Sequence, residues 1–108
     1  MITKQWGGEA FTVAVDVGDG TARLTLGGEL DLAGGERFRE ALEAALAARH
    51  RDVVIECGEL TYIDSTGISL ICQARLGLQD GGTLVLRGAQ PGTQRAIELC
   101  GLGDWLDE

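Results

Sequence analysis

The sequence predicts an α/β domain with a mostly parallel sheet and helices packed against it, and three observations support this prediction. Short apolar runs with strand periodicity alternate with longer stretches of helical periodicity. The chain has 108 residues, which suits one domain with one core. Hydrophobic residues make up 44% and charged residues 24%, a globular composition rather than a disordered one. We therefore interpret residues 1–108 as a single domain.

The N-terminal part predicts a β-hairpin behind a frayed start. Residues 1–10 show little periodicity and are expected to be frayed. Residues 11–17 and 21–26 each alternate apolar and other side chains, as half-buried strands do. The segment 18–20 reads Gly-Asp-Gly and predicts the turn between them.

The period then changes from strand to helix. Residues 27–35 break the alternation, and residues 36–49 carry apolar side chains at helical spacing with charged side chains on the other face. His50 follows this helix between two arginines, where a cation complements the helix dipole, so we interpret it as solvated rather than catalytic.

A central strand and a second helix follow. Residues 53–57 are almost continuously apolar, which is typical of a strand covered on both faces. Residues 58–59 predict a turn, and 60–63 a further apolar run. From about Thr66 to Gln79 the spacing is helical again. A helix this apolar is either largely buried, which we favour, or presents an apolar face to a partner.

The C-terminal part predicts one more strand, one short helix and a final edge strand. Glycines in 80–82 end the preceding helix, and 83–87 reads as a strand. Residues 88–92 form a loop before a helix over 93–100. Apolar residues within 102–106 predict a short edge strand.

Charge and cysteine content narrow the function classes. The formal net charge is −8, so the surface repels nucleic acid and anionic lipid, and a partner with a basic docking face fits better. Cys57, Cys72 and Cys100 form neither a disulfide framework nor a zinc motif, and their apolar neighbours suggest reduced thiols in the core. The start lacks the apolar core of a signal peptide, and no run approaches the ~20 residues of a membrane helix. We expect a cytoplasmic protein that does not insert into membranes.

The polar cluster Asp64-Ser65-Thr66 stands between an apolar strand and an apolar helix. Such residues favour helix starts, because their oxygens accept hydrogen bonds from free backbone N–H groups. A hydroxyl at this positive end of a helix could carry a phosphate without disrupting the fold. The alternative is that Ser65 or Thr66 is an ordinary cap.

Motifs for catalysis and cofactor binding are absent. No nucleophile elbow surrounds Ser65, and the chain has no P-loop and no dinucleotide fingerprint after a strand. Glu29, Asp31 and Asp64 could hold a divalent cation through hard oxygen ligands. We favour the alternative that Asp31 and Asp64 are capping or turn residues. The sequence therefore predicts no enzyme, no cofactor and no metal.

Four segments together resemble a known family. Residues 28–31 read Gly-Glu-Leu-Asp, and residues 62–68 lead an apolar run into Asp-Ser-Thr-Gly-Ile. The Gly-Gly strand at 81–86 and the Cys-Gly-Leu at 100–102 complete the pattern. Over residues 11–106 the chain resembles the STAS domain family, specifically the bacterial anti-sigma factor antagonists.

The resemblance implies a four- to five-stranded sheet with helices mostly on one side, and a phosphorylation switch. The unmodified antagonist binds an anti-sigma factor and frees the sigma factor. That same partner, a serine protein kinase, phosphorylates the serine of the motif, here Ser65, and a serine phosphatase restores it. The resemblance also implies that the partner-binding residues are Asp31, Asp64, Ser65, Thr66, Gly67 and Ile68.

Two departures from the family pattern leave other functions open. The usual Thr after Gly-Glu-Leu-Asp is replaced within residues 32–35, and the C-terminal helix of many members has no counterpart before Glu108. One alternative is a STAS subunit of a lipid ABC transport complex that docks on a permease. Another is a sensor domain that binds a nucleotide or another anion at the helix that begins near Ser65.

Overall fold

The computed structural model describes residues 2–7, 10–47, 52–78 and 81–107. Over these residues the strands form one sheet in which every strand lies beside its neighbours in chain order. The first three strands pair antiparallel, and the remaining pairs are parallel, which confirms the predicted α/β class with an N-terminal hairpin. The strands are β1 (Ile2–Gly7), β2 (Phe11–Gly18), β3 (Thr21–Leu30), β4 (Asp52–Ile63), β5 (Thr83–Arg87) and β6 (Leu106–Asp107).

Strand β1 corrects two expectations. Residues 2–7 are not frayed, because they pair with β2 from Ile2 opposite Val17 to Gly7 opposite Thr12. The described sheet therefore has six strands rather than four or five. An edge strand is held by backbone hydrogen bonds on one side and needs no apolar alternation, which is why its periodic signal is weak. Residues 1, 8 and 9 lie outside the described residues.

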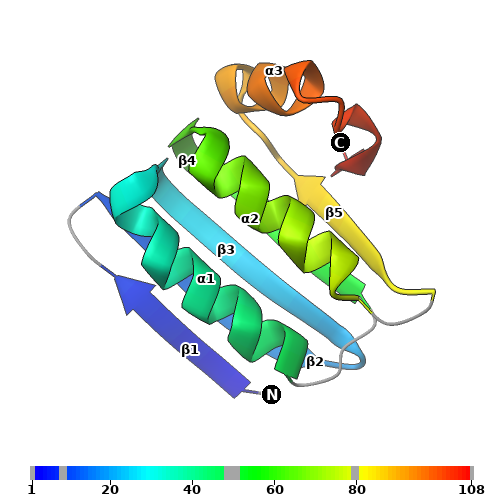
Figure 1. Ribbon diagram of the computed structural model, residues 1–108. Coiled ribbons are helices and arrows are strands. Elements are labelled where there is room, and N and C mark those ends of the chain that lie inside the picture. Colours follow the sequence, from blue (N-terminus) through cyan, green and yellow to red (C-terminus); the bar gives the residue numbers. More distant parts are fainter. Residues whose placement is uncertain (1, 8–9, 48–51, 79–80, 108) are drawn as a thin grey trace.

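Helices α1 (Leu32–Ala47) and α2 (Ser65–Leu76) lie side by side across one face of the sheet (Figure 1). Helix α3 (Pro91–Leu99) lies at one end, where β4 continues beyond its pairing with β5. The Thr93 hydroxyl donates to the Leu60 carbonyl there at 3.5 Å. A short 3-10 turn, η1 (Gly103–Trp105), leads into β6. The predicted edge strand at the C-terminal end is confirmed by β6, which pairs parallel with β5.

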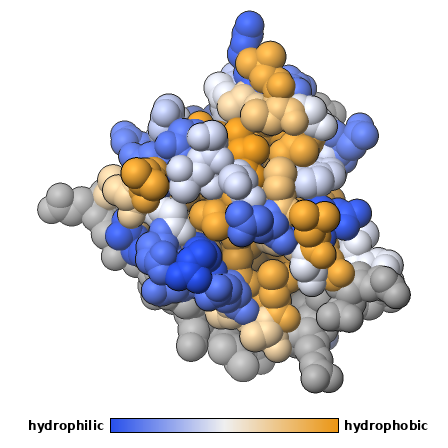
Figure 2. All heavy atoms as spheres, viewed as in Figure 1, coloured by the Kyte–Doolittle hydropathy of each residue, from blue (hydrophilic) through white to orange (hydrophobic). Residues whose placement is uncertain are grey.

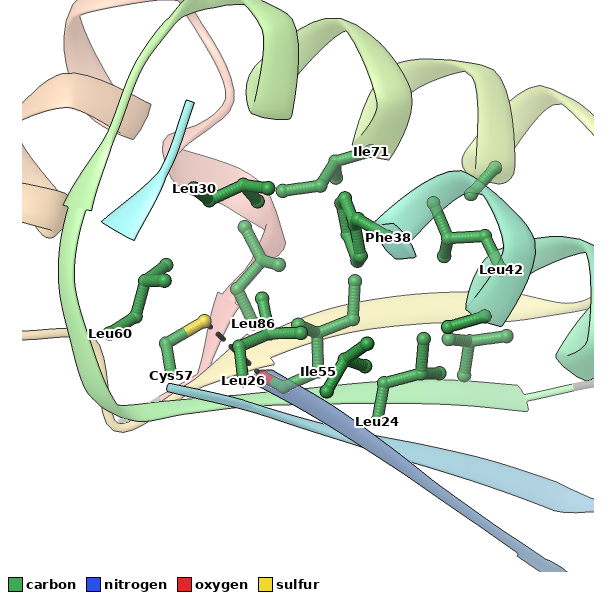
Figure 3. Close-up of a cluster of buried hydrophobic side chains, with 14 of the residues drawn as sticks. Leu24, Leu26, Leu30, Phe38, Leu42, Ile55, Cys57, Leu60, Ile71 and Leu86 are labelled. Atoms are coloured by element: carbon green, nitrogen blue, oxygen red, sulfur yellow. Dashed lines mark hydrogen bonds between the residues drawn. The ribbon is translucent and has the colours of Figure 1, made fainter. Parts of the chain in front are cut away.

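The core lies between the sheet and the first two helices. Alternate strand residues point toward the helices, and Figure 3 shows Leu24, Leu26 and Ile55 below Phe38 and Ile71. Phe38 also meets the ring of Phe11 edge to face, with centroids 6.2 Å apart. Because each apolar strand residue in this core is followed by one on the other face, the alternation of the sequence maps directly onto the two sides of the sheet.

The other face of the sheet carries charges, so the prediction that β4 is covered on both faces is wrong. Glu56 on β4 pairs with Arg23 on β3 and with Arg87 on β5, the latter at 3.8 Å. Arg87 also contacts Asp107 at 2.9 Å. Val54 lies on this face and is only 9% exposed, although α1 and α2 lie on the opposite face. Val54 makes the run of residues 53–57 almost continuously apolar, and this is why the sequence predicted a strand covered on both faces.

Helix α1 begins four residues earlier than the periodicity predicted. Asp31 caps it, and Gly34 and Gly35 lie inside its first turns. A Cβ at Gly34 would lie 3.0 Å from Phe11 Cγ, so glycine allows the helix to approach β2. Glycine has a low helix propensity, so residues 32–35 were not predicted to be helical. The close packing against β2 explains why the helix nevertheless begins there. The predicted helix end at 49 and His50 lie outside the described residues.

Other boundaries also differ, since β3 continues beyond residue 26 to Leu30 and α3 begins at Pro91 rather than at 93. Strand β4 runs through Gly58 and Glu59 without the predicted turn, and shifts in its register with β3 absorb the irregularity. Helix α2 ends at Leu76, where the Gly77 N–H donates to the carbonyls of Gln73 and Ala74. Gln79, the predicted end, lies outside the described residues. Only one side of α2 is buried, so the expected burial of most of this helix is wrong.

Candidate functional site

The site is built where two parallel strands end side by side. Leu30 at the end of β3 lies opposite Ile63 at the end of β4, and the Asp64 N–H donates to the Leu30 carbonyl at 3.1 Å. Each strand is followed by an aspartate and then by a helix, so α1 and α2 begin at the same edge of the sheet (Figure 1). This edge, at the carboxyl ends of parallel strands, is where open α/β sheets usually place their sites.

Both aspartates cap helices. Asp64 Oδ1 accepts hydrogen bonds from the N–H groups of Thr66 at 2.9 Å and Gly67 at 3.4 Å. Asp31 Oδ1 accepts from Ala33 at 3.0 Å and Gly34 at 3.2 Å. The interpretation of these aspartates as capping residues is therefore confirmed.

Ser65 is consequently not the cap but the first residue of α2. Its side chain is exposed, and within the described part of the chain its hydroxyl has no hydrogen-bond partner. Because Asp64 already serves two free backbone N–H groups, the helix does not need the Ser65 hydroxyl. The hydroxyl is thus free to react or to contact a partner.

A shallow groove of about 600 Å³ runs between α1 and α2 beside Ser65. Its two walls come from successive turns of the two helices, with apolar side chains among hydroxyls and charges. In the same view as Figure 1, Figure 2 shows hydrophobic residues along the middle of the helical face and a hydrophilic patch over the exposed side of α1. The groove, named here the α1/α2 groove, is lined by Leu32, Gly35, Glu36, Arg39, Ser65, Thr66, Ser69, Leu70 and Gln73.

Charges on α1 form the rim of the α1/α2 groove. Arg39 contacts Glu36 and, at 2.7 Å, Glu43. The hydrogen bond from Arg39 holds the pKa of Glu36 below its ordinary value, and the same hydrogen bond raises the pKa of Arg39. The rim is therefore charged at neutral pH, with acidic groups in excess over this single arginine.

Most of the groove was not predicted from the sequence. Glu36 and Arg39 were expected only on the charged face of their helix, and Leu32 and Ser69 had no predicted role. A usable signal existed, because Ser65 and Ser69 are one helical turn apart and so share a face. That the two helices lie next to each other could not be read from either helix alone.

The predicted partner-binding residues divide into two groups. Ser65 is exposed, and Asp31, Asp64 and Thr66 are half-buried at the same edge. In contrast, Gly67 is buried and Ile68 is only 9% exposed. These last two seat the first turn of α2 on the sheet, and the partner-binding role of all six residues stays a prediction. The list of residues at the surface is thus Asp31, Asp64, Ser65 and Thr66.

The geometry does not assemble the cation site considered above. Among residues 2–7, 10–47, 52–78 and 81–107, no three His, Cys, Asp or Glu side chains are grouped to hold a metal ion. Asp31 and Asp64 use their oxygens as caps. His50 lies outside the described residues. Within the same ranges, each helix is too short or too polar to span a bilayer.

The chain belongs to the STAS domain family. The family model described as "Mlab, STAS domain" matches residues 13–107, which is nearly the whole chain. This match covers both aspartate-capped helix starts and the groove between them, and it confirms the resemblance found in the sequence.

The chain is also similar to anti-sigma factor antagonists in sequence and in structure. The Anti-sigma-F factor antagonist RsfB of Mycobacterium tuberculosis is 29% identical over 96 residues, which cover 87% of this chain and 77% of the relative. The anti-sigma factor antagonist SpoIIAA in its unphosphorylated form superposes with a TM-score of 0.79 at 22% identity, covering 88% of this chain and 85% of that chain. An anti-sigma factor antagonist from Mycobacterium paratuberculosis gives 0.82 at 23% identity, covering 88% and 81%. The structural likenesses establish a shared fold.

Proposed function

We propose that this protein is an anti-sigma factor antagonist switched by phosphorylation of Ser65. The unmodified form binds an anti-sigma factor, which is also a serine protein kinase, and thereby releases a sigma factor in the cytoplasm. Phosphorylation by that partner blocks binding, and a serine phosphatase reverses the block. The observation that carries the proposal is the exposed Ser65 hydroxyl, without a partner among the described residues, at the first position of α2 beside the α1/α2 groove.

The fold is expected to tolerate phosphate on Ser65. The side chain is exposed, so the modification displaces no core group. Asp64, not Ser65, provides the cap, so the helix start keeps its hydrogen bonds. The partial positive charge of the helix N-terminus offsets part of the added negative charge.

Partner binding is expected to fail instead. The phosphate adds about −1.5 to −2 charges at neutral pH. It would stand in the groove beside the acidic Asp64 and near Glu36 on the opposite wall. A partner matched to a neutral hydroxyl would then have to desolvate this charge or clash with it. The switch is therefore local electrostatics at an interface, without unfolding.

The proposed docking surface consists of Asp31, Asp64, Ser65 and Thr66, with Gly67 and Ile68 as the buried support beneath them. The α1/α2 groove extends this surface along both helices. Leu32, which is 80% exposed, supplies an apolar contact at one wall. The surrounding acidic side chains suit a partner with basic groups at the rim.

The test combines modification with binding. The purified protein is incubated with the cognate anti-sigma factor and ATP, and intact mass and circular dichroism are recorded. We expect one added phosphate on the wild type and on Ser69→Ala, none on Ser65→Ala, and an unchanged helical spectrum. Ser69 is the matched control, because it is an exposed serine one turn further along the same groove. Phosphate on Ser65→Ala would contradict the site, and loss of helix on modification would contradict the mechanism.

A second candidate is a STAS subunit of a lipid ABC transport complex that docks on a permease through the same helix start. It is retained because the matching family model, described as "Mlab, STAS domain", assigns the chain to the STAS family without naming anti-sigma factor antagonists. In that case the wild type should bind the permease complex and gain no phosphate on Ser65 when it is incubated with that complex and ATP. Co-purification with a sigma-regulating kinase, lost in Ser65→Glu, would exclude this candidate.

A further inference from the structure

The two helices that form the groove touch at a glycine. A Cβ placed on Gly35 of α1 would lie 2.9 Å from Thr66 Cγ2 on α2, closer than Cβ atoms ever approach a neighbour, and 3.8 Å from Leu70 Cδ1. Gly35, Thr66 and Leu70 all line the α1/α2 groove. The contact is therefore at the floor of the groove, and only the missing side chain of Gly35 allows it.

The first turns of α1 and α2 both pack tightly against the sheet. A Cβ at Gly67 would lie 2.7 Å from Leu30 Cγ, and one at Gly34 would lie 3.0 Å from Phe11 Cγ. Leu30 and Phe11 are themselves fully buried, so neither helix can settle closer to the sheet. An added methyl group at Gly35 must then be accommodated mainly by moving α1 and α2 apart.

Thr66 cannot easily turn away from such a methyl group. Its side chain is branched at Cβ, and few χ1 rotamers of β-branched residues are allowed in a helix. Thr66 also directly follows Ser65, and its N–H is held by Asp64. A displacement of Thr66 is therefore passed on to the Ser65 hydroxyl and to the cap.

We propose that Gly35 and Thr66 are positioning residues for the docking surface. Their contact sets the distance across the groove between Leu32 on α1 and Ser65 on α2, and so determines whether a partner can contact both walls at once. This inference rests on the proposed function, because it assigns the spacing of the same surface to a particular pair of residues. Neither residue needs to touch the partner for this role.

The test is a rescue experiment. Affinity for the cognate anti-sigma factor is measured for the wild type, Gly35→Ala, Thr66→Ser and the double variant. Thr66→Ser removes only the methyl group that the new Cβ would meet. We expect Gly35→Ala to weaken binding about tenfold or more in the wild-type background, but less than about threefold when it is added to Thr66→Ser. The affinity of Thr66→Ser alone is the reference for this second comparison, because Thr66 also belongs to the proposed docking surface.

Controls separate spacing from folding. Gly92→Ala adds a Cβ that meets nothing within 4 Å and should bind as the wild type does. Denaturant unfolding of each variant shows that it is folded. Binding by Gly35→Ala equal to the wild type overturns the proposal. So does a loss of affinity from Gly35→Ala that is equally large when it is added to Thr66→Ser.

A second readout does not depend on the partner. If the wild type binds no anti-sigma factor, the proposed function fails. The effect of Gly35 on the spacing of α1 and α2 can still be measured from backbone amide NMR shifts. We expect Gly35→Ala to shift the amide signals of Leu32, Ser65 and Ser69, and the double variant to restore them. Unchanged signals at Ser65 and Ser69 in Gly35→Ala would overturn the positioning role itself.

Discussion

Asp64 separates the structural task at the start of α2 from the regulatory task that we propose for Ser65. Its carboxylate closes the free end of the helix, so the neighbouring Ser65 hydroxyl makes no contribution to the cap. If a serine were both cap and phosphate acceptor, each modification would disturb the helix start. With the two tasks on adjacent residues, phosphate can change the surface while the scaffold stays the same.

This division predicts how Asp64 variants behave. Asp64→Ala leaves two N–H groups without their acceptor and should lower the free energy of unfolding by about 0.5–2 kcal/mol. Asp64→Asn keeps an oxygen acceptor and should cost clearly less. Urea unfolding followed by circular dichroism measures both. Equal losses for the two substitutions would mean that the carboxylate acts through its charge and not as a cap.

Cys57 is a second residue whose setting determines its chemistry. It is 1% exposed, and its thiol donates weakly to the Ile55 carbonyl at 3.5 Å (Figure 3). Burial, with a smaller contribution from the neighbouring Glu56, raises the pKa of the Cys57 thiol from 9.0 to about 12. The native state therefore keeps the proton over a pH range in which the unfolded chain has lost it.

The resulting pH dependence has a definite sign. Below pH 9 the Cys57 thiol is protonated in both the native and the unfolded protein, so it does not make the free energy of unfolding depend on pH. Between pH 9 and about 12 only the unfolded chain loses the proton, and the free energy of unfolding should fall by about 1.4 kcal/mol per pH unit. Stability is thus lost as pH rises. Urea midpoints of the wild type and Cys57→Ala between pH 8 and 10.5 test this. Parallel curves for the two proteins would refute the assignment to Cys57.

At the scale of elements, glycines determine how closely the helices approach the sheet. Gly67 lies under the first turn of α2, where a Cβ would be 2.7 Å from Leu30 Cγ and 2.8 Å from Ile63 Cγ1. Both neighbours are buried and have no free space to enter. The start of α2 can therefore rest on the ends of β3 and β4 only with glycine at this position.

Two glycine substitutions should have opposite outcomes. Alanine in a helix is favoured over glycine by up to about 1 kcal/mol, but overpacking a core costs about 1–3 kcal/mol. Gly67→Ala should therefore destabilise the protein by about 1–2 kcal/mol. Gly92→Ala in α3, where the new Cβ meets nothing within 4 Å, should be neutral or slightly stabilising. Thermal unfolding measures both, and a stable Gly67→Ala would show that the strand ends can yield.

At the scale of the whole molecule, the net charge of −8 acts on every encounter with a partner. The charges on the open face of the sheet largely pair with one another, as Arg23, Glu56, Arg87 and Asp107 do. Such exposed pairs contribute little to stability. The acidic excess therefore matters more for association than for folding.

This excess predicts a salt dependence of association with the proposed anti-sigma factor. If the partner's docking face is basic, raising NaCl from about 50 to about 300 mM should slow association by about three- to tenfold, because the ions screen the attraction. Dissociation should change much less. Stopped-flow mixing measures the two rates separately. An association rate that is independent of salt would mean that charge does not guide this encounter.

Much of the fold could be predicted from periodicity, because burial on one face leaves a direct mark on the sequence. The alternation in β2 and β3 and the helical spacing of α1 correspond to side chains that now form the core. The Asp64-Ser65-Thr66 cluster likewise marked the start of α2 by capping chemistry alone. These are local effects, and each can be read within a few neighbouring residues.

The family, the helix start and the exposed serine were thus determined by the sequence itself. Only the tertiary structure decided that β1 joins the sheet, that α1 begins at Leu32, and that Gly35 meets Thr66 across a groove. These features depend on contacts between segments that are separated along the chain, by about thirty residues for Gly35 and Thr66. A linear pattern records which side chains avoid water, but the distance between two helices is set by the surfaces that finally meet.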